Sequence, residues 1–264
     1  MEYTFWQKQT DKPLFPELEW SRPENKTYAG KLLLIGGSSL GFASVAEAYG
    51  SAEKAGAGTV RVLLPDRLQK TVSKLFPAAE FALSNPSGGF SQLAMADLVD
   101  ASVWADGVLL AGDTGRNSET AVVLENFLEK YEGQATITKD AADLFCVQPF
   151  SILQRPDTLL VISMGQLQKL GTNAKFARAF TSTMGLVQLV EALHEFTKRF
   201  TPYIITRHAD QFIVAVNGQV STTKCPADHP IWRVQTAASA SVWWLQTPGK
   251  PFEALTTSVT KRPV

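Results

Sequence analysis

The segment from Lys31 to Pro65 constrains the fold of this chain more than any other. It begins with a short apolar run, Leu32–Ile35, which is followed by the glycine pair Gly36-Gly37 and by small and apolar residues at helical spacing over 42–54. A second apolar run follows two further glycines. A strand, a glycine turn, a helix, a glycine turn and a strand in this order predict a βαβ unit. The backbone amides at the start of such a helix attract anionic groups such as phosphates.

Similar patterns recur along the rest of the chain. Strands that alternate with helices indicate a mostly parallel sheet with helices on both faces. The strong turn Asn217-Gly218 predicts a late antiparallel hairpin formed by 211–216 and 219–222. We therefore expect an α/β fold in a single domain over residues 1–264, with residues 1–30 as an N-terminal arm. Apolar runs predict further strands at 107–111, 134–138, 158–162 and 203–206.

Helical spacing predicts the elements between these strands. Asn173 is expected to cap one long amphipathic helix that ends near Arg199. Other helices are predicted over 66–76, 91–101, 118–130, 233–246 and 250–258. Because ligands in open α/β sheets lie beyond the carboxyl ends of the strands, the loops that follow the strands should share one edge of the sheet. These loops are 36–42, 112–117, 138–143, 162–166 and 206–210.

The charge balance and the cysteines exclude several classes of protein. Lys plus Arg and Asp plus Glu number 25 each, so no net basic field is present to attract nucleic acid or a membrane surface. Cys146 and Cys225 match no metal-ligand spacing, and we expect neither a metal site nor a disulfide framework. The N-terminal region lacks the apolar run of a signal peptide, and no run approaches the length of a membrane helix. We expect a cytoplasmic protein.

The glycine turn after the first strand matches neither standard phosphate-binding pattern. In a Gly-x-Gly-x-x-Gly reading that starts at Gly36, Ser38 stands where the second glycine belongs. A Walker loop needs a lysine after its last glycine, and Phe42 is there instead.

The same segment, however, resembles the opening of a known family. The Ile-Gly-Gly-Ser start at 35–38 and the Ala-Gly-Ala-Gly-Thr-Val finish at 55–60 are similar to those of the NAD(P)H-hydrate dehydratases. Gly112 and Gly115 keep two glycines of that family's Gly-Pro-Gly-Leu-Gly loop, and Asp140 matches the first Asp of its Asp-Ala-Asp-Ala-Leu motif. The resemblance runs from about 26 to 255. It is most specific in its first part.

The resemblance implies a ribokinase-like fold and a nucleotide-dependent lyase that repairs hydrated NAD(P)H. The implied cofactor is ATP or ADP with Mg²⁺, the implied ligand is NAD(P)H-like, and a homo-oligomer is implied by analogy. Asp113, which follows a strand, is a candidate to bind a ligand or magnesium, and Arg207 is a candidate to hold a phosphate. The candidate nucleotide- or substrate-binding residues are Gly36, Gly37, Ser38, Gly112, Asp113, Gly115, Asp140, Arg207 and His208.

Several departures from the family pattern bear on catalysis. In the family, a Gly-Thr-Gly-Asp sequence opens a late helix, and its Asp is the catalytic base. Our alignment places Ala237-Ala238-Ser239 there, with Ser239 at the Asp position. A serine hydroxyl does not accept a proton as a carboxylate does, so general-base catalysis worth about 10² to 10⁴-fold should be lost. The family's His and Glu in Thr-Pro-His-x-Gly-Glu become Ser163 and Gln166.

Three hypotheses about function therefore stay open. The chain is a divergent dehydratase-like protein that is weakly active or inactive. Alternatively, it is a non-catalytic nucleotide-binding or scaffold protein that presents exposed aromatic residues, for which Trp232, Trp243 and Trp244 are candidates. The third is a small-molecule kinase, in which Asp143 or Asp210 would replace the lost carboxylate.

Overall fold

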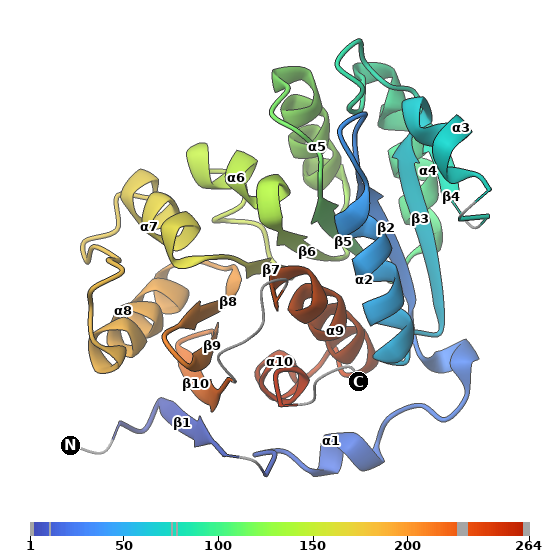
Figure 1. Cartoon of the computed structure of the whole chain (residues 1–264). Coiled ribbons are helices and arrows are strands. Elements are labelled where there is room, and N and C mark those ends of the chain that lie inside the picture. The colour runs from blue at the N-terminus through green and yellow to red at the C-terminus, as the bar shows by residue number, and fades with distance from the viewer. Residues whose placement is uncertain (1–2, 11, 75, 78, 226–231, 261–264) are drawn as a thin grey trace.

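A computed structural model describes residues 3–10, 12–74, 76–77, 79–225 and 232–260. One ten-stranded sheet runs through the molecule in the order β1-β10-β9-β8-β7-β6-β5-β2-β3-β4 (Figure 1). Neighbouring strands are parallel except where β9 pairs with β8 and with β10. The strands are β1 Trp6–Gln9, β2 Lys31–Gly36, β3 Thr59–Pro65, β4 Ala79–Ala82, β5 Gly107–Gly112, β6 Gln134–Thr138, β7 Thr158–Val161, β8 Tyr203–His208, β9 Gln211–Val216 and β10 Gln219–Lys224.

Helices cover both faces of the sheet, which confirms the predicted α/β layering. The side chains of α2, α9 and α10 pack against one face, and those of α4 to α8 pack against the other. Short 3-10 turns lie at Lys26–Tyr28, Asp66–Leu68 and Gln92–Ala94. The α-helices are α1 Glu17–Trp20, α2 Ala43–Lys54, α3 Gln69–Val72, α4 Met95–Trp104, α5 Ser118–Lys130, α6 Lys139–Val147, α7 Met164–Asn173, α8 Leu186–Arg199, α9 Trp232–Gln246 and α10 Pro251–Ser258.

The apolar run of β2 forms a central strand because both of its faces are covered. Successive side chains in a strand point to opposite faces. Leu33 and Ile35 enter the core beneath α4 to α8, and Leu32 and Leu34 enter the core beneath α2 and α9. All four side chains are fully buried, as a central parallel strand requires.

The predicted antiparallel hairpin is confirmed. Asn217 and Gly218 join β9 to β10 with φ angles of +48° and +82°. A two-residue hairpin of this type needs positive φ at both turn positions, and Asn-Gly is the pair that adopts it most readily.

The predicted long helix from Asn173 to Arg199 is wrong. Asn173 is the last residue of α7, and α8 begins at Leu186. Ser163 and Gln166 form a capping box that starts α7. Lys175 adopts a left-handed φ of +50°, which is typical of the residue just after a helix C-terminus. The helix predicted over 66–76 is also shorter, since the α-helical part covers only Gln69–Val72.

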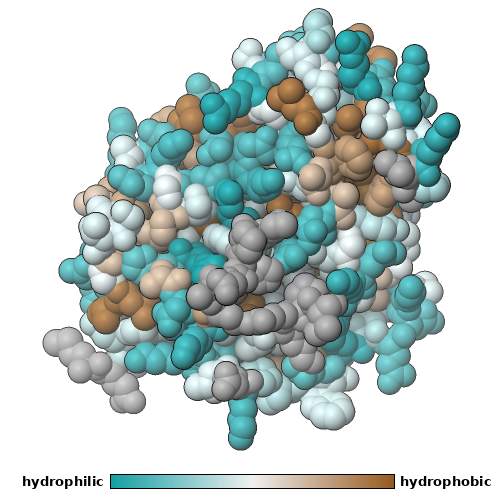
Figure 2. All heavy atoms as spheres, in the orientation of Figure 1, coloured by the Kyte–Doolittle hydropathy of each residue, from teal (hydrophilic) through white to brown (hydrophobic). Residues whose placement is uncertain are grey.

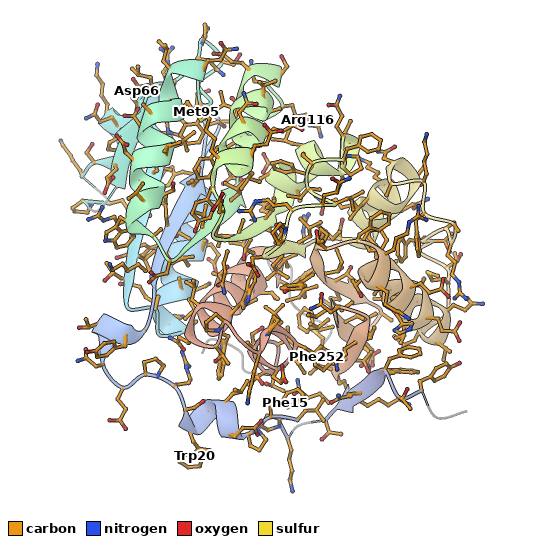
Figure 3. All side chains as sticks on the ribbon, turned by 180° about the vertical axis from the view of Figure 1, so that it is seen from behind. Phe15, Trp20, Asp66, Met95, Arg116 and Phe252 are labelled. Carbon is orange, nitrogen blue, oxygen red and sulfur yellow. The ribbon has the colours of Figure 1, made fainter. Side chains whose placement is uncertain are left out.

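The N-terminal arm extends the sheet. β1 adds in parallel to β10, and the Gln9 amide donates to Thr223 Oγ1 at 3.0 Å and to the Thr256 carbonyl at 2.8 Å. Phe15 then packs edge-on against Phe252 of α10, with ring centroids 6.0 Å apart (Figure 3). The arm thus forms part of the packed structure.

The surface bears on one of the functional hypotheses. On the face shown in Figure 2, hydrophilic side chains cover most of the area and apolar ones form separate patches. Trp243 and Trp244, expected on an exposed aromatic surface, are 2% and 1% exposed, and Trp232 is half-buried against Phe212. Trp244 packs against Tyr203 in the core beneath α2 and α9, and Trp243 packs against Leu18 of α1 and Ala254 of α10. None of the helices in the described part of the chain combines the length and the apolar character needed to cross a lipid bilayer.

Candidate functional site

The carboxyl ends of β2 and β5 meet at a pair of glycines. The Gly37 amide donates to the Gly112 carbonyl at 2.9 Å, and a β-carbon on Gly36 would lie 2.5 Å from the same oxygen. Gly36 therefore permits a close backbone approach that a side chain would block. Gly37 has a φ of +80°, which turns the chain out of the strand. The loops 36–42 and 112–117 begin side by side, as predicted.

Asp140 holds the loop that follows β5. Its carboxylate accepts hydrogen bonds from the Asp113 amide at 2.6 Å, the Gly115 amide at 3.0 Å and the Thr114 hydroxyl at 3.4 Å. Gly112 has a φ of +101°, and a β-carbon there would lie 2.7 Å from Asp140 Oδ1. The structure thus gathers Gly112, Asp113, Gly115 and Asp140, and the Asp140 carboxylate is used in positioning this loop.

The first turn of α2 is capped by a carboxylate from the protein itself. Asp113 Oδ2 accepts a hydrogen bond from the Ser44 amide at 2.6 Å. Lys139 Nζ lies 2.6 Å from Ser44 Oγ and 3.5 Å from Asp113 Oδ1. A helix N-terminus favours negative charge, and here Asp113 supplies it. The anion site that the βαβ pattern predicts is therefore filled by a side chain.

Ser38, in the loop after β2, lies beside the loop after β5. It is buried and exchanges backbone hydrogen bonds with Gly41. Ser38, Gly115 and Arg116 line one small cavity of about 260 Å³. The predicted residues from the loops after β2 and β5 are thus neighbours in space.

Gln166 links three elements at the same edge. Its amide donates to the Lys139 carbonyl at 2.6 Å and to Asp143 Oδ1 at 3.1 Å. Its oxygen accepts from Arg233 in the first turn of α9 at 3.0 Å. A series of contacts therefore crosses the sheet edge from α2 to α9. We call it the polar seam; it consists of Ser44, Asp113, Lys139, Gln166 and Arg233.

Sequence reasoning missed two cations of the polar seam. Lys139 directly follows β6, in a loop expected on the ligand edge, and that position was a usable signal. Arg233 gave no comparable signal, because its role depends on where α9 begins.

Arg207 and His208 lie apart from the glycine loops. Both are half-buried at the end of β8. In the sheet, β8 and β2 are separated by the strands β7, β6 and β5. At the usual strand spacing, β8 and β2 are therefore about 19 Å apart. Phe212, paired with Arg207 across the hairpin, contacts Trp232 with ring centroids 5.7 Å apart. Arg207 is therefore near the start of α9, on the opposite side of the seam from Ser44.

Ser239 lies in the interior of α9. It is 4% exposed, and its hydroxyl is 3.5 Å from the Ser258 carbonyl of α10. In the described residues α9 begins at Trp232, so its first turn carries Arg233 and Gln235 rather than the Ala237–Ser239 stretch. Gln235 Nε2 donates to Glu47 Oε1 of α2 at 2.6 Å. Glu47 is thus the carboxylate that contacts this first turn.

The cysteines and carboxylates bear on nucleophilic and metal chemistry. Burial raises the pKa of the Cys146 thiol to about 12, so it stays protonated and unreactive at neutral pH. Within the part of the chain that the structure describes, no three His, Cys, Asp or Glu side chains gather as a metal site would need. Asp228 and His229, which follow Cys225 closely in the sequence, lie outside the described residues.

Comparison with solved structures identifies the fold as ribokinase-like, as the sequence resemblance implied. A ribokinase-like superfamily protein from Enterococcus faecalis is 15% identical, with a TM-score of 0.72 over 98% of this chain and 87% of that one. A hypothetical protein from Streptococcus mutans gives 0.69 at 15% identity, over 92% and 84%. The ADP/ATP-dependent NAD(P)H-hydrate dehydratase from Bacillus subtilis, co-crystallised with ATP and Mg²⁺, gives 0.64 at 12% identity, over 94% and 86%. No family model and no curated protein matches the sequence.

Proposed function

We propose that this ribokinase-like chain is a divergent relative of the NAD(P)H-hydrate dehydratases. In this proposal the chain binds a nucleotide-type ligand at the carboxyl edge of the sheet, and it is weakly active or inactive as a lyase. The dehydratase of this fold from Bacillus subtilis was crystallised with ATP and Mg²⁺. At the carboxyl edge of its sheet, the present chain has Lys139, Arg207 and Arg233, all half-buried. Half-buried cations suit the phosphates of a nucleotide, because partial desolvation strengthens their attraction for anions.

The composition of the first turn of α9 is the observation that supports the loss of activity. This turn offers Arg233 and the amide of Gln235. An amide cannot accept a proton as a carboxylate does. Asp113, Asp140 and Asp143 each accept hydrogen bonds from the protein itself, which competes with a role as base. General-base catalysis contributes about 10² to 10⁴-fold, so its loss would leave little turnover.

Magnesium fits this site only in company with a nucleotide. The described carboxylates at the edge do not converge as metal ligands. Mg²⁺ commonly relies on substrate phosphates and water in addition to one or two carboxylates. The protein's own part would be to hold the phosphates with Lys139 and Arg233.

Ligand binding is tested by thermal shift. ATP or ADP with Mg²⁺, or NADPH, should stabilise the chain by about 2.7 kcal/mol at a concentration 100 times its dissociation constant. Arg233→Met should reduce this shift. Lys250→Met, at an exposed position beyond the other end of α9, is the matched control and should not. If none of these nucleotides stabilises the wild-type chain, the proposal fails.

A second candidate function, a small-molecule kinase or an active dehydratase, is favoured by Glu47. Its carboxylate reaches the first turn of α9, where it accepts a hydrogen bond from Gln235 Nε2 at 2.6 Å. A substrate hydroxyl in place of that amide would lie within the reach of a general base. Of the substitutes expected from the sequence, Asp143 is bonded to Gln166, and Asp210 is exposed in the turn after β8.

Turnover assays separate the two functions. Hydrated NADPH with ATP, and small hydroxylated substrates with ATP, would be offered to the wild type, to Glu47→Gln and to Glu53→Gln. Glu53 is an exposed residue at the other end of α2. Our proposal expects little or no turnover in all three. Turnover that falls at least about 100-fold in Glu47→Gln alone would establish an enzyme with Glu47 as its base.

A further inference from the structure

A groove separates α5 from α6 on the face of the sheet opposite α2 and α9. Two cavities of about 520 Å³ and 470 Å³ lie along it, and both are lined by Glu125 and Phe145. The first runs along the N-terminal half of α5, from Gly115 to Glu125, and the second along its C-terminal half to Glu132. Because they share two lining residues, they form one continuous depression, which we call the α5–α6 groove.

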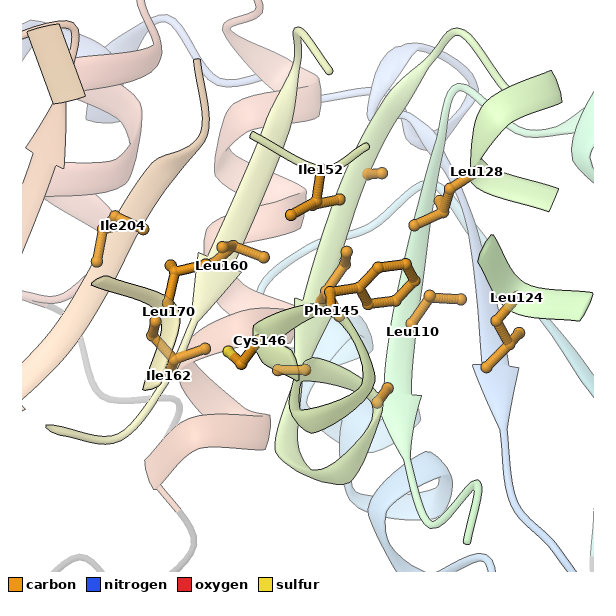
Figure 4. Close-up of a cluster of buried hydrophobic side chains, with 14 of the residues drawn as sticks. Leu110, Leu124, Leu128, Phe145, Cys146, Ile152, Leu160, Ile162, Leu170 and Ile204 are labelled. Carbon is orange, nitrogen blue, oxygen red and sulfur yellow. The ribbon is translucent and has the colours of Figure 1, made fainter. Parts of the chain in front are cut away.

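The floor of the groove is apolar. Figure 4 shows Leu128 of α5, Phe145 of α6 and Ile152 converging between the two helices. Three apolar side chains are exposed on the segments that line or adjoin the groove. Val122 is 44% exposed and Val147 is 60% exposed, and both line the first cavity. Phe150 is 67% exposed and lies between the lining residues Gln148 and Ser151.

The charges around the groove are mostly acidic. Glu125, Glu129 and Glu132 follow one another along α5 and line the second cavity. Arg155 also lines it, but its guanidinium donates to a set of acceptors within the protein. Arg116 and Lys169 at the other end are accompanied by Asp140 and Asp143. Carboxylates outnumber cations along the groove, which favours an occupant that carries positive charge beside its apolar face.

The shape and the charge together select the kind of occupant. α5 has 13 residues, which corresponds to about 20 Å at the rise of an α-helix. A helix of three to four turns fits such a length. It contacts a groove through apolar side chains at positions i, i+3, i+4 and i+7. A second copy of this chain, related by a two-fold axis, would set the same acidic rim against itself, which costs energy through like-charge repulsion.

We infer that the α5–α6 groove docks a basic amphipathic helix of a partner protein. The apolar face of that helix covers Val122, Val147 and Phe150, and its lysines or arginines face Glu125, Glu129 and Glu132. One end of the groove adjoins the candidate site, because Gly115, Asp140 and Asp143 line the first cavity and Asp143 also contacts Gln166 of the polar seam. Glu129 and Glu132 lie at the other end, so variants there test docking separately from nucleotide binding.

The test uses a fluorescently labelled synthetic helix of about 14 residues, with leucines at those four spacings and lysines along one flank. Its anisotropy is titrated with the full chain. We expect saturable binding that weakens about tenfold in Phe150→Ser, an effect of the size seen for interface anchors. Glu129→Lys combined with Glu132→Lys should weaken binding similarly and reduce its salt dependence.

Two exposed control variants lie away from the groove. Val103→Ser on α4, where Val103 is 81% exposed, and Glu24→Lys in the arm should bind as the wild type does. Circular dichroism melts confirm that all variants fold. The inference is overturned by absence of binding, by equal binding of a peptide whose lysines are replaced by glutamates, or by equal binding of the groove and control variants. It is also overturned if the chain dimerises through this face, seen as a halved mass in Phe150→Ser.

Discussion

Replacing Arg155 by methionine should lower the free energy of unfolding by about 3 kcal/mol, because hydrogen bonds to charged groups are worth about 1.5–3 kcal/mol each and are not additive. Arg155 Nε donates to the Leu128 carbonyl at 3.1 Å, and Nη2 donates to the Gly133 carbonyl at 2.8 Å and also to the Tyr131 carbonyl. Nη1 donates to Thr158 Oγ1 at 2.8 Å. The guanidinium thus joins the end of α5 to the start of β7.

A lysine should not replace this arginine. The acceptors surround a planar fork of donors, whereas a lysine carries one compact ammonium. Arg155→Lys should therefore recover only part of the loss. The positive charge also lies at the C-terminus of α5, where the carbonyl groups favour it.

The matched control is Arg178→Met. Arg178 pairs with Glu191 at 3.3 Å and with Glu195 at 2.9 Å, but its side chain is 45% exposed. Exposed pairs contribute about 0–1 kcal/mol. Urea denaturation followed by circular dichroism measures both variants, and an unchanged m-value indicates that stability alone has changed. If the two substitutions have equal effects, the bonding of Arg155 does not stabilise the fold as we argue.

The sequence predicted best those elements that depend on neighbouring residues. The bounds of α5 and β6 match their predictions, since caps, apolar spacing and glycine turns are local signals. The hairpin at Asn217-Gly218 is local in the same sense. The addition of β1 to β10 could not be predicted in this way, because Gln9 and Thr223 are 214 positions apart in the sequence.

The candidate site was predicted in part for a similar reason. The glycine loops after β2 and β5 are readable motifs, and they do meet at the sheet edge. The contact of Glu47 with Gln235 spans 188 positions. In sequence, Glu47 is an ordinary polar residue on a helix. Only the packing of α2 beside α9 gives it a place at the site.

Asp113 illustrates a further limit of motif reading. Its position after β5 made it a candidate ligand, and the structure does direct its carboxylate to the ligand edge. There, however, it caps α2 and pairs with Lys139. A motif shows that a backbone can receive an anion, but it does not show whether a side chain of the same protein already occupies the place.

Alanine at Gly36 should lower the free energy of unfolding by about 2–3 kcal/mol, in the range that overpacking of a buried position costs. Its added carbon would lie 2.5 Å from the Gly112 carbonyl oxygen and 2.9 Å from Val45 Cγ2. Neither neighbour can move away freely, because the first belongs to the backbone of β5 and the second is buried in the core. The strands must separate, which also lengthens the hydrogen bond from Gly37 to Gly112.

Alanine at Gly50 adds the same methyl group with the opposite expected sign. Gly50 lies within α2, and a β-carbon there meets no other atom within 4 Å. The substitution should raise the free energy of unfolding by about 0.5–1 kcal/mol, because alanine favours a helix interior over glycine. Chemical denaturation of the two variants therefore tests the glycine turn directly. If Gly36→Ala were neutral or stabilising, the backbones of β2 and β5 would be able to move apart at this junction without loss of stability. The close approach that fixes the loops 36–42 and 112–117 side by side would then not determine the site.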